Sequence, residues 1–106
     1  MATTHAAPGQ LIDLFSSEGP ESIALIRDEH FEVFRLGMKA GKTLPEHQLA
    51  SLSTIQCLRG RIEIDAQGRK QSMPAGSMMY LESCEPRTIR ALEDSSILVT
   101  MRVKRA

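Results

Sequence analysis

The chain of 106 residues has no tryptophan, one tyrosine and three phenylalanines. Proteins that bind single-stranded nucleic acid or sugars stack the ligand on aromatic side chains, so a platform of that kind is poorly supported here. An excess of one charge is also missing, because thirteen lysines and arginines balance thirteen acidic residues. Without a net positive charge, we expect neither nucleic acid nor an anionic membrane as a partner.

Long apolar runs are absent too, and none approaches the roughly 20 residues that cross a bilayer. Residues 1–10 contain no basic region followed by an apolar run, so we expect no secretory signal and a cytoplasmic location. Only two cysteines occur, Cys57 and Cys84. In a chain long enough to bury its own core, one pair without an export signal indicates two reduced thiols.

The length and the ordinary apolar content of 42% predict one globular domain, and the sequence contains no internal repeat. Residues 1–10 are small and polar with a Pro8-Gly9 break, which predicts a loose N-terminal arm. Residues 11–106 would then form the folded domain. We expect no functional residues in the arm, and all candidate site residues lie in the domain.

Short apolar runs separated by glycine and proline predict an all-β fold, either a sandwich or a barrel. Phe34, Leu36 and Met38 repeat every second residue, which favours strands over a helix across residues 21–36. Gly68 lies between two further runs and suits a hairpin turn with positive φ. The expected strands cover residues 22–27, 31–38, 61–65, 69–73 and 96–103.

Three residues, Gly41, His47 and Gly60, have the spacing of a known signature. The cupin superfamily has a first segment with a glycine, five residues, a His-x-His pair, a glutamate and a closing glycine. The sequence resembles this family over about residues 31–103, and Gly76 matches the glycine of its second segment. The resemblance implies a cupin-like jelly-roll β-barrel, and also a homodimer in which edge strands near the N-terminus pair.

The family's metal ligands are mostly replaced. Leu49 stands where the second histidine belongs, Ser53 where the glutamate belongs, and Arg87 where the second segment has its histidine. A permanently protonated arginine cannot bind a metal ion, and divalent metals need three or four nitrogen, sulfur or carboxylate ligands. We therefore expect no cofactor. The alternative is a divalent iron, manganese, nickel or zinc ion held by an unconventional set around His47.

The resemblance and strand alternation place one row of side chains inside the barrel: His47, Leu49, Ser51, Ser53, Ile55 and Cys57. The candidate ligand-binding residues are the polar members of this row together with one residue of the second segment: His47, Ser51, Ser53, Cys57 and Arg87. His47 could instead be a buried histidine satisfied by the backbone or by Ser53. A replacement metal site with Cys57 and Cys84 is the weaker alternative for the same residue.

If Arg87 points into the barrel, it needs an anion or a carboxylate partner, because an unpaired buried guanidinium is too costly. Glu63, Glu82 or Glu85 could supply that partner within the chain. A bound carboxylate or phosphate would supply it in a pocket.

Three functions remain open at this stage. The favoured one is a metal-free protein, non-catalytic or weakly catalytic, that binds a small molecule in the barrel pocket, with a small anion favoured as the ligand. The second is a metal-dependent cupin enzyme of the dioxygenase, isomerase or decarboxylase type, and the third is a barrel used only for protein association. A polar interior would favour a ligand, whereas an interior filled with methionine and leucine would favour association.

Overall fold

A computed structural model describes residues 5–15, 22–44, 52–82 and 87–103 of the chain. All regular elements in this part are β-strands and none is a helix, so the all-β expectation is confirmed. None of the described residues lies in a helix long and apolar enough to cross a membrane. The strands are β1 Ile23–Arg27, β2 Phe31–Met38, β3 Thr43–Leu44, β4 Ser53–Arg59, β5 Arg61–Ala66, β6 Arg69–Pro74, β7 Met78–Leu81, β8 Arg87–Ala91 and β9 Ser95–Arg102.

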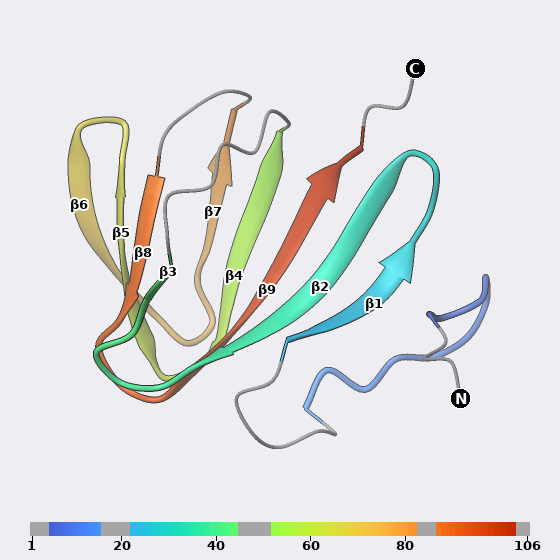
Figure 1. The fold of residues 1–106 in the computed structure, drawn as a ribbon, viewed down its shortest axis with the longest axis horizontal. Helices are drawn as coiled ribbons and strands as arrows, with labels where there is room; N and C mark the ends of the chain where they lie inside the picture. The colour runs from blue at the N-terminus through green and yellow to red at the C-terminus, as the bar shows by residue number, and fades with distance from the viewer. Residues whose placement is uncertain (1–4, 16–21, 45–51, 83–86, 104–106) are drawn as a thin grey trace.

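The strands form two antiparallel sheets with the orders β1-β2-β9-β4-β7 and β3-β8-β5-β6. Four links that lie wholly within the described residues carry the chain from one sheet to the other: β2 to β3, β4 to β5, β6 to β7, and β8 to β9. These four links lie together at the lower end of the molecule in Figure 1. We call this the glycine end, because Gly41, Gly60 and Gly76 lie in three of the links. The opposite end, where β4 and β8 begin, is the arginine end. The arrangement is the expected jelly-roll barrel.

The core lies between the two sheets and is built by alternation along each strand. In β4, Ser53, Ile55 and Cys57 are buried while the residues between them are partly exposed. The expected interior row is therefore confirmed for these three positions, and its earlier members lie outside the described residues. The core cluster is aliphatic and sulfur-containing: Met38, Ile55, Cys57, Ile62, Ile64, Ala66, Met73, Leu81, Ile89, Ala91, Ile97 and Val99.

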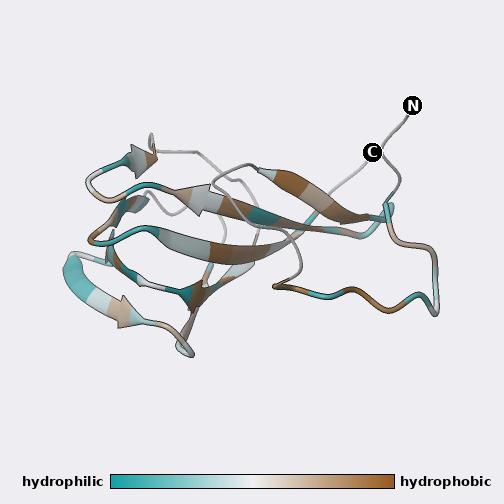
Figure 2. Cartoon of the chain, turned by 90° about the horizontal axis from the view of Figure 1, so that it is seen from below, coloured by the Kyte–Doolittle hydropathy of each residue, from teal (hydrophilic) through white to brown (hydrophobic). Residues whose placement is uncertain are grey.

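The predicted hairpin is formed by β5 and β6. Ala66 pairs with Arg69, which leaves a two-residue turn of Gln67 and Gly68 with φ of 57° and 70°. Two positive φ angles are typical of the type I′ turn that matches the twist of a hairpin. β6 is an edge strand that begins with the charged residues Arg69 and Lys70. Figure 2 shows the first part of this strand in teal, the colour of hydrophilic residues. Charged side chains at a sheet edge discourage pairing with other chains.

Residues 5–15 run beside and across the five-stranded sheet, and we call them the N-terminal strap. The backbone N–H of Ala6 donates a 2.9 Å hydrogen bond to the carbonyl oxygen of Leu25 in β1. Arg35 of β2 donates from Nη1 to the carbonyl oxygen of Leu14 at 3.0 Å. Because the core-facing residue of β2 beside it is Leu36, Arg35 faces the outside of the sheet, and the strap buries it to 6% exposure.

Candidate functional site

The strongest candidate for a functional group is the side chain of Arg87, which points into the barrel at the arginine end. Arg87 opens β8 in the same alternation as the buried core residues Ile89 and Ala91. Only 4% of Arg87 and 3% of Ser53 is exposed. Nη1 of Arg87 donates a 2.9 Å hydrogen bond to Oγ of Ser53, and Nη2 donates one of 3.4 Å to the backbone carbonyl of Glu82. Two residues expected at the site thus meet inside the barrel.

The sequence offered three glutamates as partners for Arg87. Glu63 is not its partner, because Glu63 lies on the outer face of the four-stranded sheet with Oε1 3.5 Å from Nη2 of Arg90. Glu82 contributes its backbone carbonyl, and Glu85 lies outside the described residues. The hydroxyl of Ser53 and this carbonyl are neutral acceptors, and Arg87 has further interactions besides these two. A buried guanidinium forms stronger hydrogen bonds with an anionic acceptor.

His47 and Ser51 lie outside the described residues, as does Cys84, so their part in a site stays a prediction. Among the residues that the structure does describe, no three histidine, cysteine or acidic side chains gather as a metal site would require. The expectation of a metal-free barrel, and its alternative around His47, both stay predictions. What the structure contributes is the burial of Ser53 and Arg87 and the hydrogen bond between them.

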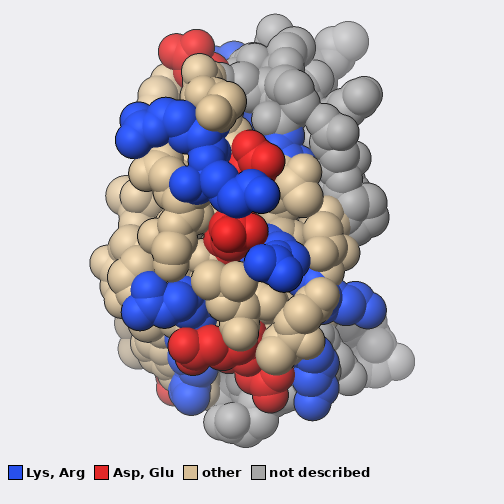
Figure 3. All heavy atoms as spheres, turned by 90° about the vertical axis from the view of Figure 1, so that its left-hand side faces the viewer, with Lys and Arg blue, Asp and Glu red and all other residues tan. Residues whose placement is uncertain are grey.

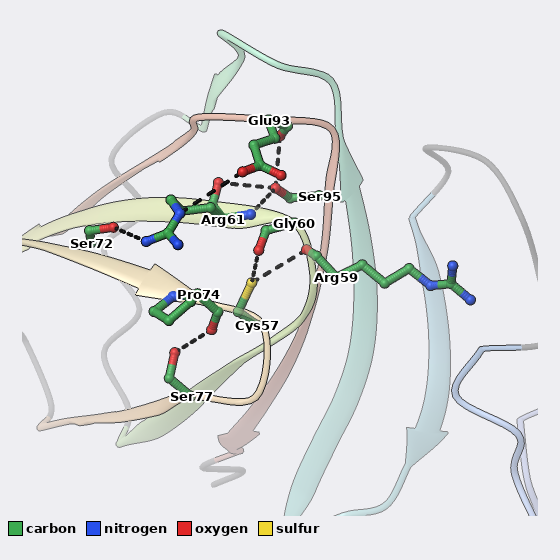
Figure 4. A network of polar contacts seen from close by, with 9 residues as sticks. All are labelled: Cys57, Arg59, Gly60, Arg61, Ser72, Pro74, Ser77, Glu93 and Ser95. Atoms are coloured by element: carbon green, nitrogen blue, oxygen red, sulfur yellow. Dashed lines mark hydrogen bonds and ion pairs between the residues drawn. The ribbon is translucent and has the colours of Figure 1, made fainter.

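Cys57 lies toward the glycine end of β4, so about 13 Å of strand separate it from Ser53 at the ordinary rise per residue. It is a free thiol with 1% of its surface exposed. Figure 4 shows its Sγ beside the carbonyl oxygens of Arg59 and Gly60, at 3.4 and 3.7 Å. Burial raises the pKa of the Cys57 thiol. The structure therefore does not bring Cys57 together with Arg87, and the thiol is protonated at neutral pH.

The links at the glycine end are joined through Ser95, a residue that the sequence did not single out. Its Oγ accepts a 3.1 Å hydrogen bond from the backbone N–H of Arg61 and donates one of 2.7 Å to the carbonyl oxygen of Glu93. Gly60 allows this approach, since a Cβ there would collide with the carbonyl oxygen of Asp94 and with Oγ of Ser95. The signature glycine Gly60 is therefore required because the β4–β5 link packs closely against the β8–β9 link.

A second polar feature, which the sequence did not single out, is a groove of about 190 Å³ on the outer face of the four-stranded sheet. Figure 3 shows this face with lysine, arginine, aspartate and glutamate side chains intermingled. Polar residues alternate with buried apolar ones along β5 and β8, and this alternation indicates which side chains face outward. The groove is lined by Thr43, Glu63, Asp65, Lys70, Thr88 and Arg90.

Solved structures show which fold this is. A conserved protein of unknown function from Streptococcus pyogenes is similar over 100% of both chains, with a TM-score of 0.79 and 15% identity. A cupin superfamily protein from Desulfitobacterium hafniense matches 96% of this chain and 97% of its own, with a TM-score of 0.81 and 13% identity. An RmlC-like cupin protein from Desulfovibrio desulfuricans matches 96% of this chain and 97% of its own, with a TM-score of 0.70 and 23% identity.

The sequence itself matches no protein-family model and no curated protein. At the identities of these solved structures, similarity shows the fold and not the activity, because one fold supports many functions. The fold prediction made from the glycine spacing is confirmed by these structures. The chain has the jelly-roll fold of the cupin superfamily.

Proposed function

We propose that this barrel binds a small anionic molecule at its arginine end and holds no metal ion there. The observation that carries the proposal is the buried guanidinium of Arg87, which is held in the interior by Ser53 and by the carbonyl of Glu82. A guanidinium is a planar fork that binds a carboxylate or a phosphate through two parallel N–H···O bonds. Arg87 would bind the anion, and Ser53 would orient the fork.

The described residues at the family's ligand positions do not suit a metal ion. Ser53 presents a neutral hydroxyl, and Arg87 stays protonated and has no lone pair to offer. A divalent ion about 5 Å from the guanidinium would be repelled by roughly 7 kcal/mol at an effective dielectric constant near 20. The chemistry of these two side chains favours an anion over a cation.

The rest of the described interior supports a site confined to the arginine end. Toward the glycine end, the neighbours of Ser53 and Arg87 along β4 and β8 are Ile55 and Ile89, with 1% and 6% of their surface exposed. Ile64 of β5, which is fully buried, packs in the same cluster. These aliphatic side chains exclude water from one side of the guanidinium, and a lower local dielectric constant strengthens its attraction for an anion.

Calorimetric titration of the full chain with acetate, succinate and inorganic phosphate tests the proposal. We expect at least one of these anions to bind, Arg87→Lys to weaken binding because the fork is lost, and Arg87→Ala to abolish it. Arg61→Ala is the matched control, because Arg61 lies at the glycine end with 46% of its side chain exposed. Unchanged anion binding in a folded Arg87→Ala protein would contradict the proposal.

Elemental analysis of untagged protein purified without chelator is the second test. We expect only background metal per chain. A near-stoichiometric content of iron, manganese, nickel or zinc would refute the metal-free proposal and direct attention to the enzyme hypothesis around His47.

A further inference from the structure

We propose that the groove on the outer face of the four-stranded sheet is a second binding site, which takes a small zwitterion of the α-amino acid class. The groove lies on the opposite face of β5 and β8 from Arg87. It is lined only by described residues. The inference therefore stands apart from the proposed anion site inside the barrel.

Strand pairing arranges the charges of the groove in a definite order. β5 lies between β8 and β6. Glu63 of β5 is directly opposite Arg90 of β8, while Asp65 is opposite Thr88 on β8 and Lys70 on β6. Two carboxylates on the central strand thus have one cation on each side, at successive outward positions.

The net charge of the four side chains is zero, and this limits the kind of ligand that the groove can attract. A simple anion would be attracted by Lys70 and Arg90 and repelled by Glu63 and Asp65, and a simple cation would meet the reverse. A molecule with an ammonium and a carboxylate a few ångströms apart can place each charge beside its opposite. Electrostatic complementarity of this kind determines specificity more than affinity.

Two of the four charged side chains form no ion pair with another described residue. Glu63 and Arg90 form an ion pair at 3.5 Å. Asp65 and Lys70 are direct cross-strand neighbours, but none of the ion pairs between described residues joins them. The ammonium of the ligand would bind Asp65 and its carboxylate Lys70, while the hydroxyl of Thr88 lies on the other side of Asp65.

The size of the groove limits the ligand to a small one. A volume of about 190 Å³ equals roughly six water molecules at their share of liquid volume. Pockets for drug-sized ligands occupy about 300–1,000 Å³. L-Alanine has a suitable size and charge separation. Since the charged side chains are solvent-exposed, we expect weak binding, with a dissociation constant on the order of 1–10 mM.

Titration of the ¹⁵N-labelled full chain with L-alanine, followed by NMR, tests this site. We expect saturable shifts of the backbone amides of Asp65, Lys70 and Thr88, and weaker binding at high salt because the charges are exposed. Propionate and ethylammonium each carry one of the two charges, and we expect each to bind at least tenfold more weakly. Equal binding of either compound, or shifts confined to Ser53 and Arg87, would overturn the proposal.

Two neighbouring substitutions on β6 provide a matched pair. Lys70→Gln removes a groove charge, whereas Arg69→Gln removes a charge from the adjacent position, whose side chain lies toward the other face of the sheet. We expect Lys70→Gln to weaken L-alanine binding at least fivefold and Arg69→Gln to leave it within twofold. Equal effects of the two substitutions, or no saturable shift in the unmodified chain, would refute the site. Both positions are exposed, so both variants should fold.

Discussion

Substitution of Gly60 by alanine tests how the glycine end is packed. Gly60 has φ of +80°, a conformation that residues with a Cβ rarely adopt. An added Cβ would also meet the carbonyl oxygen of Asp94, Oγ of Ser95 and, at 2.9 Å, Cα of Ser95. Most of these atoms belong to the backbone or to a serine that is held by hydrogen bonds to Arg61 and Glu93, so the neighbours cannot move away freely.

Both effects lower the free energy of unfolding. The left-handed conformation costs about 1–2 kcal/mol for a residue with a side chain. Forcing a methyl group into a packed region costs typically about 1–3 kcal/mol more. The sum of roughly 2–5 kcal/mol is a large part of the about 5–15 kcal/mol that stabilises a domain. At about 4–8 °C per kcal/mol, the melting temperature should fall by at least about 8 °C.

Gly41→Ala is the matched control, because Gly41 has nearly the same φ, +84°, but nothing within 4 Å of the added Cβ. It should show only the conformational cost. The stiffer unfolded chain offsets about 0.4–1 kcal/mol in both variants, so it does not affect their difference. Urea and thermal unfolding followed by circular dichroism measure both variants. Equal losses of stability in Gly60→Ala and Gly41→Ala would refute the packing argument, because they would show that the link around Ser95 yields.

Two further predictions concern residues on opposite faces of the five-stranded sheet. In a Cys84→Ser background, Cys57 should react with thiol reagents only on unfolding. The contribution of Cys57 to the free energy of unfolding should be constant below about pH 8.5, the ordinary pKa of an unfolded thiol, and fall above it, because the raised pKa keeps the folded thiol protonated. A Cys57→Ala protein that retained this slope would contradict the assignment. Arg35→Met should lower stability by about 1–3 kcal/mol and speed amide exchange at Ala6, since the carbonyl of Leu14 loses its buried donor. Unchanged exchange would show that the strap is held by other contacts.

The fold could be predicted from the sequence because it depends on local signals. Alternation of Phe34, Leu36 and Met38 identifies the core side of β2, and Gly68 marks the hairpin. The spacing of Gly41 and Gly60 follows from the geometry of two links at one end of the barrel, and both glycines have positive φ. Strand alternation and turn glycines can be recognised in the sequence whatever the protein binds.

Features that depend on the pairing order of strands could not be predicted in this way. The groove requires β5 to lie between β6 and β8, and the sequence does not state that order. Arg35 is surrounded by a regular strand pattern, so nothing marked it as buried by a strap from residues 5–15. Gln67 was equally hidden, because its positive φ follows from the two-residue turn and not from its own chemistry.

The two ends of the barrel interior surround buried residues with different groups, as Ser53 and Cys57 show. Both are buried on the same face of β4, so strand alternation alone treats them as equivalent candidates. The difference lies in their neighbours. Cys57 is beside backbone carbonyls of a link between the sheets, where its thiol fills space in the core. Ser53 is beside a buried cation from β8. Under the proposed function an anion would bind at the arginine end, because a buried guanidinium forms its strongest hydrogen bonds with anionic acceptors. We therefore expect Arg87→Lys, which keeps the charge and loses the planar fork, to weaken anion binding.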